Sequence, residues 1–317
     1  MDISVVICSY NRCDDLLRAL ETLSNSVVPK ECKWELIIVD NNSQDDTKSI
    51  CQTFQGRLPL HYIFEAQQGK SCALNRAVKE ASGDLLLFTD DDVDVTEEWI
   101  SEYFWAVKRN PMIMYFGGKI LSSWQGKPPK WFVENSDWLQ VNPRLNWGEK
   151  QFTITNMDRN FFLGANIAIR RAIFEVGLRY NDKIGPKGQF QEGNARHGAE
   201  ELDIQKMILL HGHCGLYLPT AIIYHRDPIH RMTERYLRYY YAQMGEMDAF
   251  AGNVDRSSHM WFGVPRYLFR KLLQNIMLYC VTRWIFPSKF WLNAEIKAAG
   301  AFGEIRGFRR RFKSAQL

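Results

Sequence analysis

The feature that most constrains the fold is a regular alternation of short apolar segments with amphipathic ones near the start of the chain. Residues 3–8, 34–39, 60–64 and 84–88 are rich in Val, Ile, Leu and Phe and have the length of buried β-strands. Helical periodicity follows each of them, at 14–23, 45–54, 69–81 and 97–107, with Asn11 as the predicted N-cap of the first helix. Strands that alternate with helices of this length predict an α/β fold with a Rossmann-like, mostly parallel sheet flanked by helices.

Polar residues follow each predicted strand. The four groups are Ser9-Tyr10-Asn11, Asp40-Asn41-Asn42-Ser43, 65–69 and Asp90-Asp91-Asp92. In open sheets of this kind, ligands bind beyond the carboxyl ends of the strands. We therefore expect a ligand site at this edge of the sheet.

The three consecutive aspartates at 90–92 are the most demanding of these groups. Adjacent carboxylates repel one another, and burying them is costly unless a cation or hydrogen bonds compensate. Hard cations such as Mg²⁺ and Mn²⁺ take carboxylate oxygens, and the spacing places Asp90 and Asp92 on the same side of an extended segment. The alternative is a solvated turn with helix-capping aspartates.

The periodicity is less regular after a further strand predicted at 114–120. Residues 121–158 contain four tryptophans with several Gly and Pro residues, which is typical of a long loop or lid. Order resumes at 161–170, a helix is predicted from 198 to about 210, and a last strand at 217–224 ends before His225. We divide the chain into a first half-domain at 1–120, a second at 121–240 and a helical, basic and aromatic extension at 241–317.

Charge is distributed unevenly along the chain. The whole chain carries +4, whereas residues 256–317 have twelve Lys or Arg and two Asp or Glu, so the preceding residues are net −6. Apolar and basic residues interleave in 260–313, which favours either contact with an anionic membrane surface or a helix packed on the rest of the protein. Nucleic acid is not expected as a partner, because no recognition motif accompanies the charge.

The cysteines and the apolar runs bear on location. Seven cysteines without a CxxC pair argue against a disulfide framework or zinc site and fit a reducing compartment. No uncharged apolar run is long enough to span a membrane, and the first residues do not form a secretory signal. We expect a cytoplasmic protein, peripheral on the inner face of the plasma membrane if the extension binds lipid.

The ordered motifs together resemble the family 2 glycosyltransferases, which have the GT-A fold. The resemblance covers roughly residues 3–240 and rests on the segments VVICSYNR, LIIVDNNS, GKSCALNRA and FTDDDV, on the acidic pair Glu200-Glu201 and on His225. It implies an inverting transfer of a sugar from a nucleoside-diphosphate sugar to a hydroxyl acceptor such as a polysaccharide or lipid-linked glycan. It also implies Mn²⁺ or Mg²⁺ as cofactor, with UDP as the expected donor nucleotide.

The resemblance assigns donor-binding roles by position. Ser9, Tyr10 and Asn11 match the segment around the nucleotide base, and Asp40 matches the acidic residue that contacts the base, in a stretch where many members carry Asp-Asp-Gly-Ser. Gly69 and Lys70 lie near the nucleotide, and Asn166 lies in a segment that lines the donor-sugar and acceptor pocket, although a structural turn explains that segment equally well. Asp90 matches the acid near the ribose and is also a candidate metal ligand. Asp92 matches the main metal ligand. Asp91 is expected in the donor-binding site, and its role there stays open.

Catalytic and diphosphate-side roles follow in the same way. Glu201 matches the catalytic base, with Glu200 as a competitor for that role. The alternative explanation of this acidic pair is that acidic residues favour the first turn of a helix. His225 matches a metal-binding position, and Arg226 and Arg231 are candidates for the diphosphate. Trp131 and Trp138 could stack on sugars or pack in a core. Two other classes of protein remain open: a nucleotidyltransferase and a non-catalytic sugar-binding protein.

Overall fold

The structure is a computed structural model that describes residues 1–139, 141, 143–156, 161–182, 200–251 and 259–314. The chain forms two compact units. The sheet unit comprises Met1–Ser123 and Pro143–Arg226, and the helical unit comprises Trp124–Asn142 and Asp227–Leu317. The predicted division at residues 120 and 240 stays a prediction.

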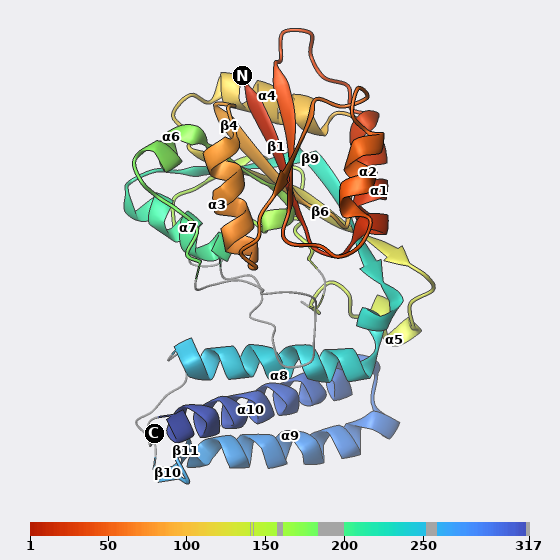
Figure 1. Ribbon diagram of the computed structural model, residues 1–317. Helices are drawn as coiled ribbons and strands as arrows, with labels where there is room; N and C mark the ends of the chain where they lie inside the picture. Colours follow the sequence, from red (N-terminus) through yellow and green to blue (C-terminus); the bar gives the residue numbers. More distant parts are fainter. Residues whose placement is uncertain (140, 142, 157–160, 183–199, 252–258, 315–317) are drawn as a thin grey trace. The chain divides into compact units, whose positions relative to one another are not determined.

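A nine-stranded mixed sheet organises the sheet unit, in the order β3-β2-β1-β4-β8-β6-β9-β5, with β7 paired to β9 (Figure 1). Its N-terminal half is parallel, since β1 pairs with β2 and β4, and β2 pairs with β3, all in parallel. The elements of this half are β1 (Ile3–Ser9), α1 (Cys13–Ser24), β2 (Trp34–Asp40), α2 (Thr47–Thr53), β3 (Leu60–Phe64), α3 (Lys70–Glu80) and β4 (Leu85–Asp90). Strand β5 (Val93–Val95), at the opposite edge of the sheet, and helix α4 (Trp99–Arg109) follow in the chain. The α/β fold with flanking helices is thus confirmed, and the predicted elements up to residue 109 are found with their ends shifted by at most two residues.

The second half of the sheet is antiparallel. Strand β8 runs against β4 and β6, and β9 runs against β5 and β7. The elements here are β6 (Tyr115–Gln125), α5 (Lys130–Val133), β7 (Phe152–Ile154), the 3-10 turn η1 (Gly164–Asn166), β8 (Ile167–Arg170), α6 (Arg171–Glu175), α7 (Glu200–Leu210) and β9 (Gly215–Pro228). Because β9 continues to Pro228, His225 lies inside a strand, opposite Val93, rather than at the strand end as predicted.

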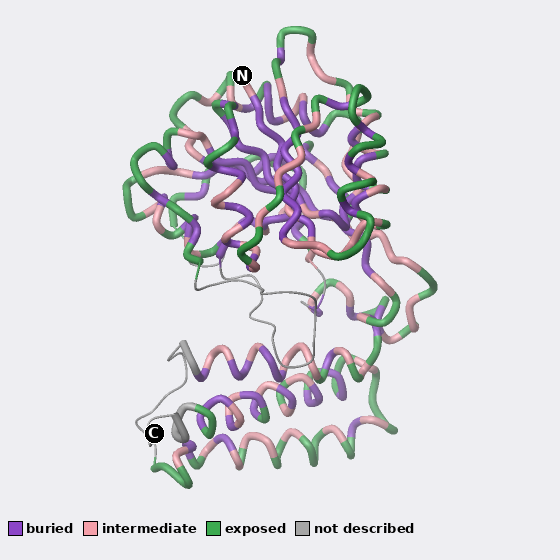
Figure 2. Tube along the Cα trace, in the orientation of Figure 1, coloured by how far each residue is buried: buried purple, intermediate pink, exposed green. Residues whose placement is uncertain are grey.

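The central strands are apolar on both faces, as a sheet covered by helices requires. Residues of β1, β2 and β4 are almost all buried, and these strands form the continuous core of the sheet unit (Figure 2). Their register pairs Ser9 with Asp40 and Cys8 with Asp90. The polar residues after the three strands therefore start from the same edge of the sheet.

Two local predictions are wrong. Asn11 is not the N-cap of α1: Arg12 is, and Asn11 instead has a φ of 50° while its Oδ1 accepts a hydrogen bond from Gln44 N at 2.6 Å. A left-handed φ suits asparagine better than most residues, so Asn11 makes a tight turn between β1 and α1. Residues 121–158 are also more ordered than a long loop, because β6 extends to Gln125 and both α5 and β7 lie in this range.

The tryptophans of that range pack in cores rather than forming an open sugar platform. In the helical unit, Trp131 makes edge-to-face contacts with Phe132 and Trp291, and Trp138 donates to Asn135 Oδ1. In the sheet unit, Trp147 packs on rings of the core. The structure therefore favours the packing alternative for these side chains.

Three long helices build the helical unit: α8 (Glu234–Ala251), α9 (Arg266–Ile285) and α10 (Ser288–Ser314), with the turn η2 (Ile229–Met232) and the hairpin strands β10 (Met260–Trp261) and β11 (Val264–Pro265). Helix α10 packs against both α8 and α9 (Figure 1). Contact with α8 is close because of glycine: a Cβ on Gly303 would lie 1.8 Å from the carbonyl oxygen of Ala242. Among the helices that the structure describes, none combines the length and apolar composition needed to cross a membrane.

Candidate active site

Strands β1 and β4 bring the first loop and the three aspartates together. Ser9, at the end of β1, donates a hydrogen bond from its Oγ to Asp91 Oδ2 at 2.7 Å, and both side chains are buried. Parallel pairing of adjacent strands produces this contact between residues more than eighty positions apart. Ser9 and Asp91, both predicted as donor-binding residues, thus form one structural pair.

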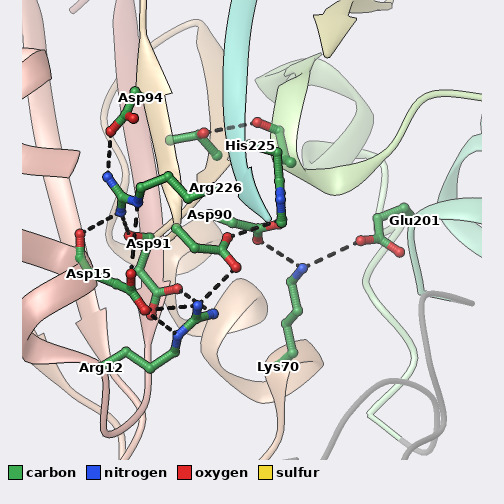
Figure 3. Close-up of polar contacts among 12 residues, drawn as sticks. Arg12, Asp15, Lys70, Asp90, Asp91, Asp94, Glu201, His225 and Arg226 are labelled. Carbon is green, nitrogen blue, oxygen red and sulfur yellow. Dashed lines mark hydrogen bonds and ion pairs between the residues drawn. The ribbon is translucent and has the colours of Figure 1, made fainter. Parts of the chain in front are cut away.

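Arg12 supplies the cation that the consecutive aspartates require. Its guanidinium lies 3.0 Å from Asp91 Oδ1, 2.9 Å from Asp92 Oδ2 and 2.9 Å from Asp15 Oδ2 (Figure 3). Burial raises the pKa of Asp91 to about 7, Arg12 opposes this shift, and the neighbouring charge of Asp92 adds to it. No role was predicted for Arg12, although it directly follows the strand that neighbours β4. That adjacency is the signal that could have identified it.

Asp92 and His225 form a pair suited to a divalent cation. His225 Nε2 lies 3.3 Å from Asp92 Oδ1, and both side chains are buried. Among the residues that the structure describes, no group of three or more His, Cys, Asp or Glu side chains is placed to hold a metal ion. Two protein ligands nevertheless fit the mode in which Mg²⁺ or Mn²⁺ keeps several waters and takes its other ligands from substrate phosphates.

Asp90, predicted as a further metal ligand, faces a lysine in the structure. Its Oδ1 lies 3.0 Å from Lys70 Nζ, in an ion pair that directs the carboxylate toward α3. Its role toward a metal stays a prediction, whereas Asp92 and His225 face each other directly.

Arg226 is occupied by the protein itself. Its backbone N–H donates to Asp92 O at 2.9 Å, its side chain donates to the backbone oxygens of Asp15 and Asp91, both at 2.7 Å, and it pairs with the carboxylate of Asp94. These contacts fix the backbone that carries the aspartates (Figure 3). Arg226 thus supports the site rather than facing a diphosphate, and Arg231 belongs to η2 in the helical unit.

Lys70 links the aspartates to the predicted base. Its Nζ lies 3.4 Å from Glu201 Oε1 and 3.9 Å from Glu200 Oε1, in addition to its contact with Asp90 (Figure 3). Burial alone would lower the pKa of Lys70, but the three carboxylates raise it well above its usual value. Lys70 therefore carries a permanent positive charge at the centre of this cluster.

A small pocket distinguishes the two glutamates of α7. The side chains of Lys70, Asp90, Tyr180 and Glu201 line it, together with Gly164. Glu201 is 8% exposed, whereas Glu200 is 1% exposed and does not line this pocket. A Cβ on Gly164 would lie 2.3 Å from Glu201 Oε1, so glycine is needed there to leave room for the Glu201 carboxylate. Residues 183–199, which include the predicted helix start at Gly198 and Ala199, lie outside the described residues.

Glu200 is a buried carboxyl whose ionisation opposes folding. Neither of its oxygens accepts a hydrogen bond from the residues that the structure describes. Burial, with the charge of Glu201 added, raises the pKa of Glu200 from 4.5 to about 7, and Lys70 opposes this only in part. A raised carboxyl pKa means that the folded chain holds the proton more tightly than the unfolded chain. Its stabilising contribution is therefore full below pH 4.5 and is lost as the pH rises toward about 7.

Glu200→Gln is accordingly expected to remove a pH dependence of stability. Relative to wild type, the free energy of unfolding of this variant should increase by up to about 3 kcal/mol between pH ~5 and pH ~8, at about 1.4 kcal/mol per pKa unit. Chemical denaturation at the two pH values measures the difference, with Glu175→Gln on the surface as the control for the substitution. If the free energies of unfolding of variant and wild type differ equally at both pH values, the pKa of Glu200 is not raised by folding.

The residues predicted to contact the nucleotide base lie at the ends of β1 and β2. Asp40 is buried, and its carboxylate accepts hydrogen bonds from Ser43 N at 2.8 Å and Tyr62 Oη at 2.7 Å. Tyr10 and Asn11 are partly exposed in the loop after β1. This places Asp40 beneath the loop and Tyr10 and Asn11 on its surface.

Asn41, for which no role was predicted, connects β2 with the start of α3. Its amide group donates to Gln67 O at 2.7 Å and accepts from Gly69 N at 2.8 Å. Gly69 is the N-cap of α3 and has a φ of 140°, a conformation that only glycine adopts readily. Asn41 and Gly69 together set the position from which Lys70 reaches the cluster.

The side chain of Asn166, whose donor-binding role stays a prediction, is hydrogen-bonded inside the protein. It is fully buried, and its Oδ1 accepts from Trp99 Nε1 and Tyr103 Oη, both at 2.8 Å. Its Nδ2 donates to the backbone oxygens of Lys119 at 3.0 Å and Ala221 at 2.9 Å. All hydrogen-bonding positions of the amide are therefore filled inside the protein, and Asn166 joins β6, β9 and α4.

Comparison with known proteins identifies the family of the chain. The family model described as Glycosyl transferase family 2 matches residues 4–178. The chain is 28% identical over 198 residues to the glucosyl-dolichyl phosphate glucuronosyltransferase of Haloferax volcanii, covering 59% of this chain and 58% of that protein. It is 22% identical over 295 residues to the hyaluronan synthase of Pasteurella multocida, covering 86% of this chain but 28% of that protein. The matched regions thus span little more than half of these relatives at most.

Solved structures share the fold at low sequence identity. A mannosyltransferase from Pyrobaculum calidifontis, solved with GDP-Man and Mn²⁺, has a TM-score of 0.53 and 18% identity, covering 99% of this chain and 79% of that one. TarS of S. aureus, solved with UDP-GlcNAc, has a TM-score of 0.51 and 14% identity, covering 100% of this chain and 92% of that one. These likenesses concern the fold alone.

Proposed function

The chain belongs to glycosyl transferase family 2, and on this premise we propose that it is an inverting, metal-dependent glycosyltransferase that uses a nucleoside-diphosphate sugar. The observation that carries the proposal is the shared pocket of Asp90, Lys70 and Glu201, in which residues 131 positions apart form one charge cluster. A second supporting observation is the adjacent pair of Asp92 and His225. The acceptor would be a hydroxyl of a polysaccharide, a lipid-linked glycan or another glycoconjugate.

In the proposed reaction, Glu201 takes the proton from the acceptor hydroxyl as that oxygen attacks the anomeric carbon. A hydroxyl is a weak nucleophile, and a carboxylate within hydrogen-bond reach assists its attack. The nucleoside diphosphate leaves from the opposite face, so a single displacement inverts the anomeric configuration. Lys70 holds Glu201 and Asp90 in fixed relation, and Ser9 and Arg12 hold the remaining aspartates.

Asp92 and His225 would hold the cation. A bound Mn²⁺ or Mg²⁺ would offset the negative charge that develops on the leaving diphosphate. We propose UDP as the donor nucleotide, with Asp40, Tyr10 and Asn11 on its base side. We place the reaction in the cytosol, because seven cysteines without a CxxC pair fit a reducing compartment.

A donor panel tests the proposal. UDP-, GDP- and dTDP-sugars are incubated with the protein in Mn²⁺, in Mg²⁺ and in EDTA, and release of nucleoside diphosphate is measured. We expect metal-dependent release from one donor. No release of nucleoside diphosphate from any donor, together with no donor binding in calorimetry, would favour a non-catalytic sugar-binding protein. Release of pyrophosphate from a nucleoside triphosphate would favour a nucleotidyltransferase.

A further inference from the structure

Helix α9 presents an apolar face outward. Its inward side, which packs toward α10, includes buried Leu268 and Thr282 and the half-buried Asn275. Trp284 on the other side is 87% exposed. The large exposed apolar side chains along the helix, here called the α9 face, are Leu273, Ile276, Met277, Leu278, Val281, Trp284 and Ile285. The helix therefore places some of its polar groups inward and much of its apolar surface outward. Most of its residues are exposed or intermediate (Figure 2).

The apolar surface continues at both ends of α9. The β10–β11 hairpin directly precedes the helix, and its residues Met260, Trp261 and Phe262 are exposed, Phe262 to 82%. After the helix, Phe286 and Phe290 are exposed as well. Isolated exposed apolar side chains are common on proteins, but a continuous patch of this kind marks an interaction surface.

The positive charge around this apolar surface indicates what kind of partner covers it. Residues 256–317 carry a net charge of +10, and Arg266 and Arg270 are exposed on the same outward side of α9 as Met277 and Trp284. Arg266 also lies over the ring of Trp261, 5.1 Å from its centroid. Basic residues beside Trp, Phe and aliphatic side chains are typical of helices that lie in the interface of an anionic bilayer. A second copy of the chain would instead place two strongly basic surfaces against each other.

We propose that the helical unit docks on anionic phospholipid bilayers through the α9 face and the hairpin residues Trp261 and Phe262. The helix lies in the plane of the interface, with its aromatic and aliphatic side chains among the acyl chains and Arg266 and Arg270 at the headgroups. This surface belongs to the helical unit, whereas the candidate catalytic residues belong to the sheet unit. The inference does not depend on the sugar transferred.

Vesicle flotation of the full-length chain tests this inference. The probe is phosphatidylcholine vesicles, with and without about 30% phosphatidylglycerol. Wild type is expected to float with the anionic vesicles, and about 0.5 M salt is expected to weaken the binding. The double variant Met277→Glu/Trp284→Glu should reduce the bound fraction by about tenfold or more.

The matched control places the same charges on exposed apolar positions of the sheet unit. Met112→Glu/Val176→Glu changes residues that are 81% and 70% exposed, and it should float like wild type. Circular dichroism melting of both double variants checks that they fold. Failure of wild type to bind the anionic vesicles would overturn the proposal. Equal loss of vesicle binding in both double variants would also overturn it. A third contradicting outcome is a wild-type dimer in light scattering that does not bind vesicles and that only Met277→Glu/Trp284→Glu dissociates.

Discussion

Glu201→Gln is expected to lower kcat for sugar transfer by about 10²- to 10⁴-fold, the range that a positioned general base contributes. An amide has nearly the shape of the carboxylate but cannot accept the proton of the acceptor hydroxyl. Glu201 lines the pocket that Asp90 and Lys70 also line, so its loss removes the carboxylate that an acceptor can reach. Donor affinity should stay close to the wild-type value, because the diphosphate-side residues are unchanged. Initial rates of transfer and calorimetric titration of the donor measure the two quantities separately.

Glu200→Gln is the matched control for this prediction. The two glutamates are adjacent on α7 and face the same lysine, but Glu200 is buried away from the pocket. We expect the Glu200 variant to retain transfer within about tenfold, well below the loss expected for a missing base. If Glu200→Gln is inactive while Glu201→Gln transfers sugar normally, the assignment of the base is wrong. Loss of donor binding by Glu201→Gln would instead point to a role of Glu201 in holding the donor.

The parallel half of the sheet was predictable because its signals are local. Apolar segments such as 34–39 and 84–88 have few alternatives to a buried strand, and the helices between them require parallel connections. From that alone, Ser9, Asp40 and Asp90 could be assigned to one edge. The antiparallel half was not predictable in the same way: the continuation of β9 through His225 depends on pairing with β5, and no local pattern encodes that pairing.

Side-chain partners were harder to predict than strands. The resemblance identified Asp92 and Glu201 as residues of interest, but sequence spacing does not reveal that Arg12 neutralises the aspartates or that Lys70 reaches both glutamates. Asn166 illustrates the same limit. The resemblance assigned it to a segment that lines the donor pocket, with a structural turn as the alternative, but sequence could not show that four internal hydrogen bonds use its side-chain amide completely.

Asp92→Asn is expected to lower metal-dependent release of nucleoside diphosphate by about 10³-fold, which corresponds to about 4 kcal/mol of lost transition-state stabilisation. In the structure, one carboxylate oxygen of Asp92 faces His225 at 3.3 Å and the other contacts Arg12 at 2.9 Å. A neutral amide keeps the shape but supplies neither the charge nor the second oxygen ligand. Release of nucleoside diphosphate across a Mn²⁺ titration measures the effect, and calorimetry of donor binding with and without Mn²⁺ provides a readout independent of turnover.

Asp15→Asn separates loss of the cation site from displacement of Arg12. Asp15 pairs with the same guanidinium at 2.9 Å, but its carboxylate is half-exposed and makes no contact with His225 among the described residues. If Asp92 acts through the metal, Asp15→Asn should keep most of the activity and the same Mn²⁺ requirement. If both variants lose activity equally and respond alike to Mn²⁺, then the aspartates act by positioning Arg12. In that case the guanidinium, rather than a divalent ion, would be the cation that faces the diphosphate, because it is already held among these carboxylates by three ion pairs.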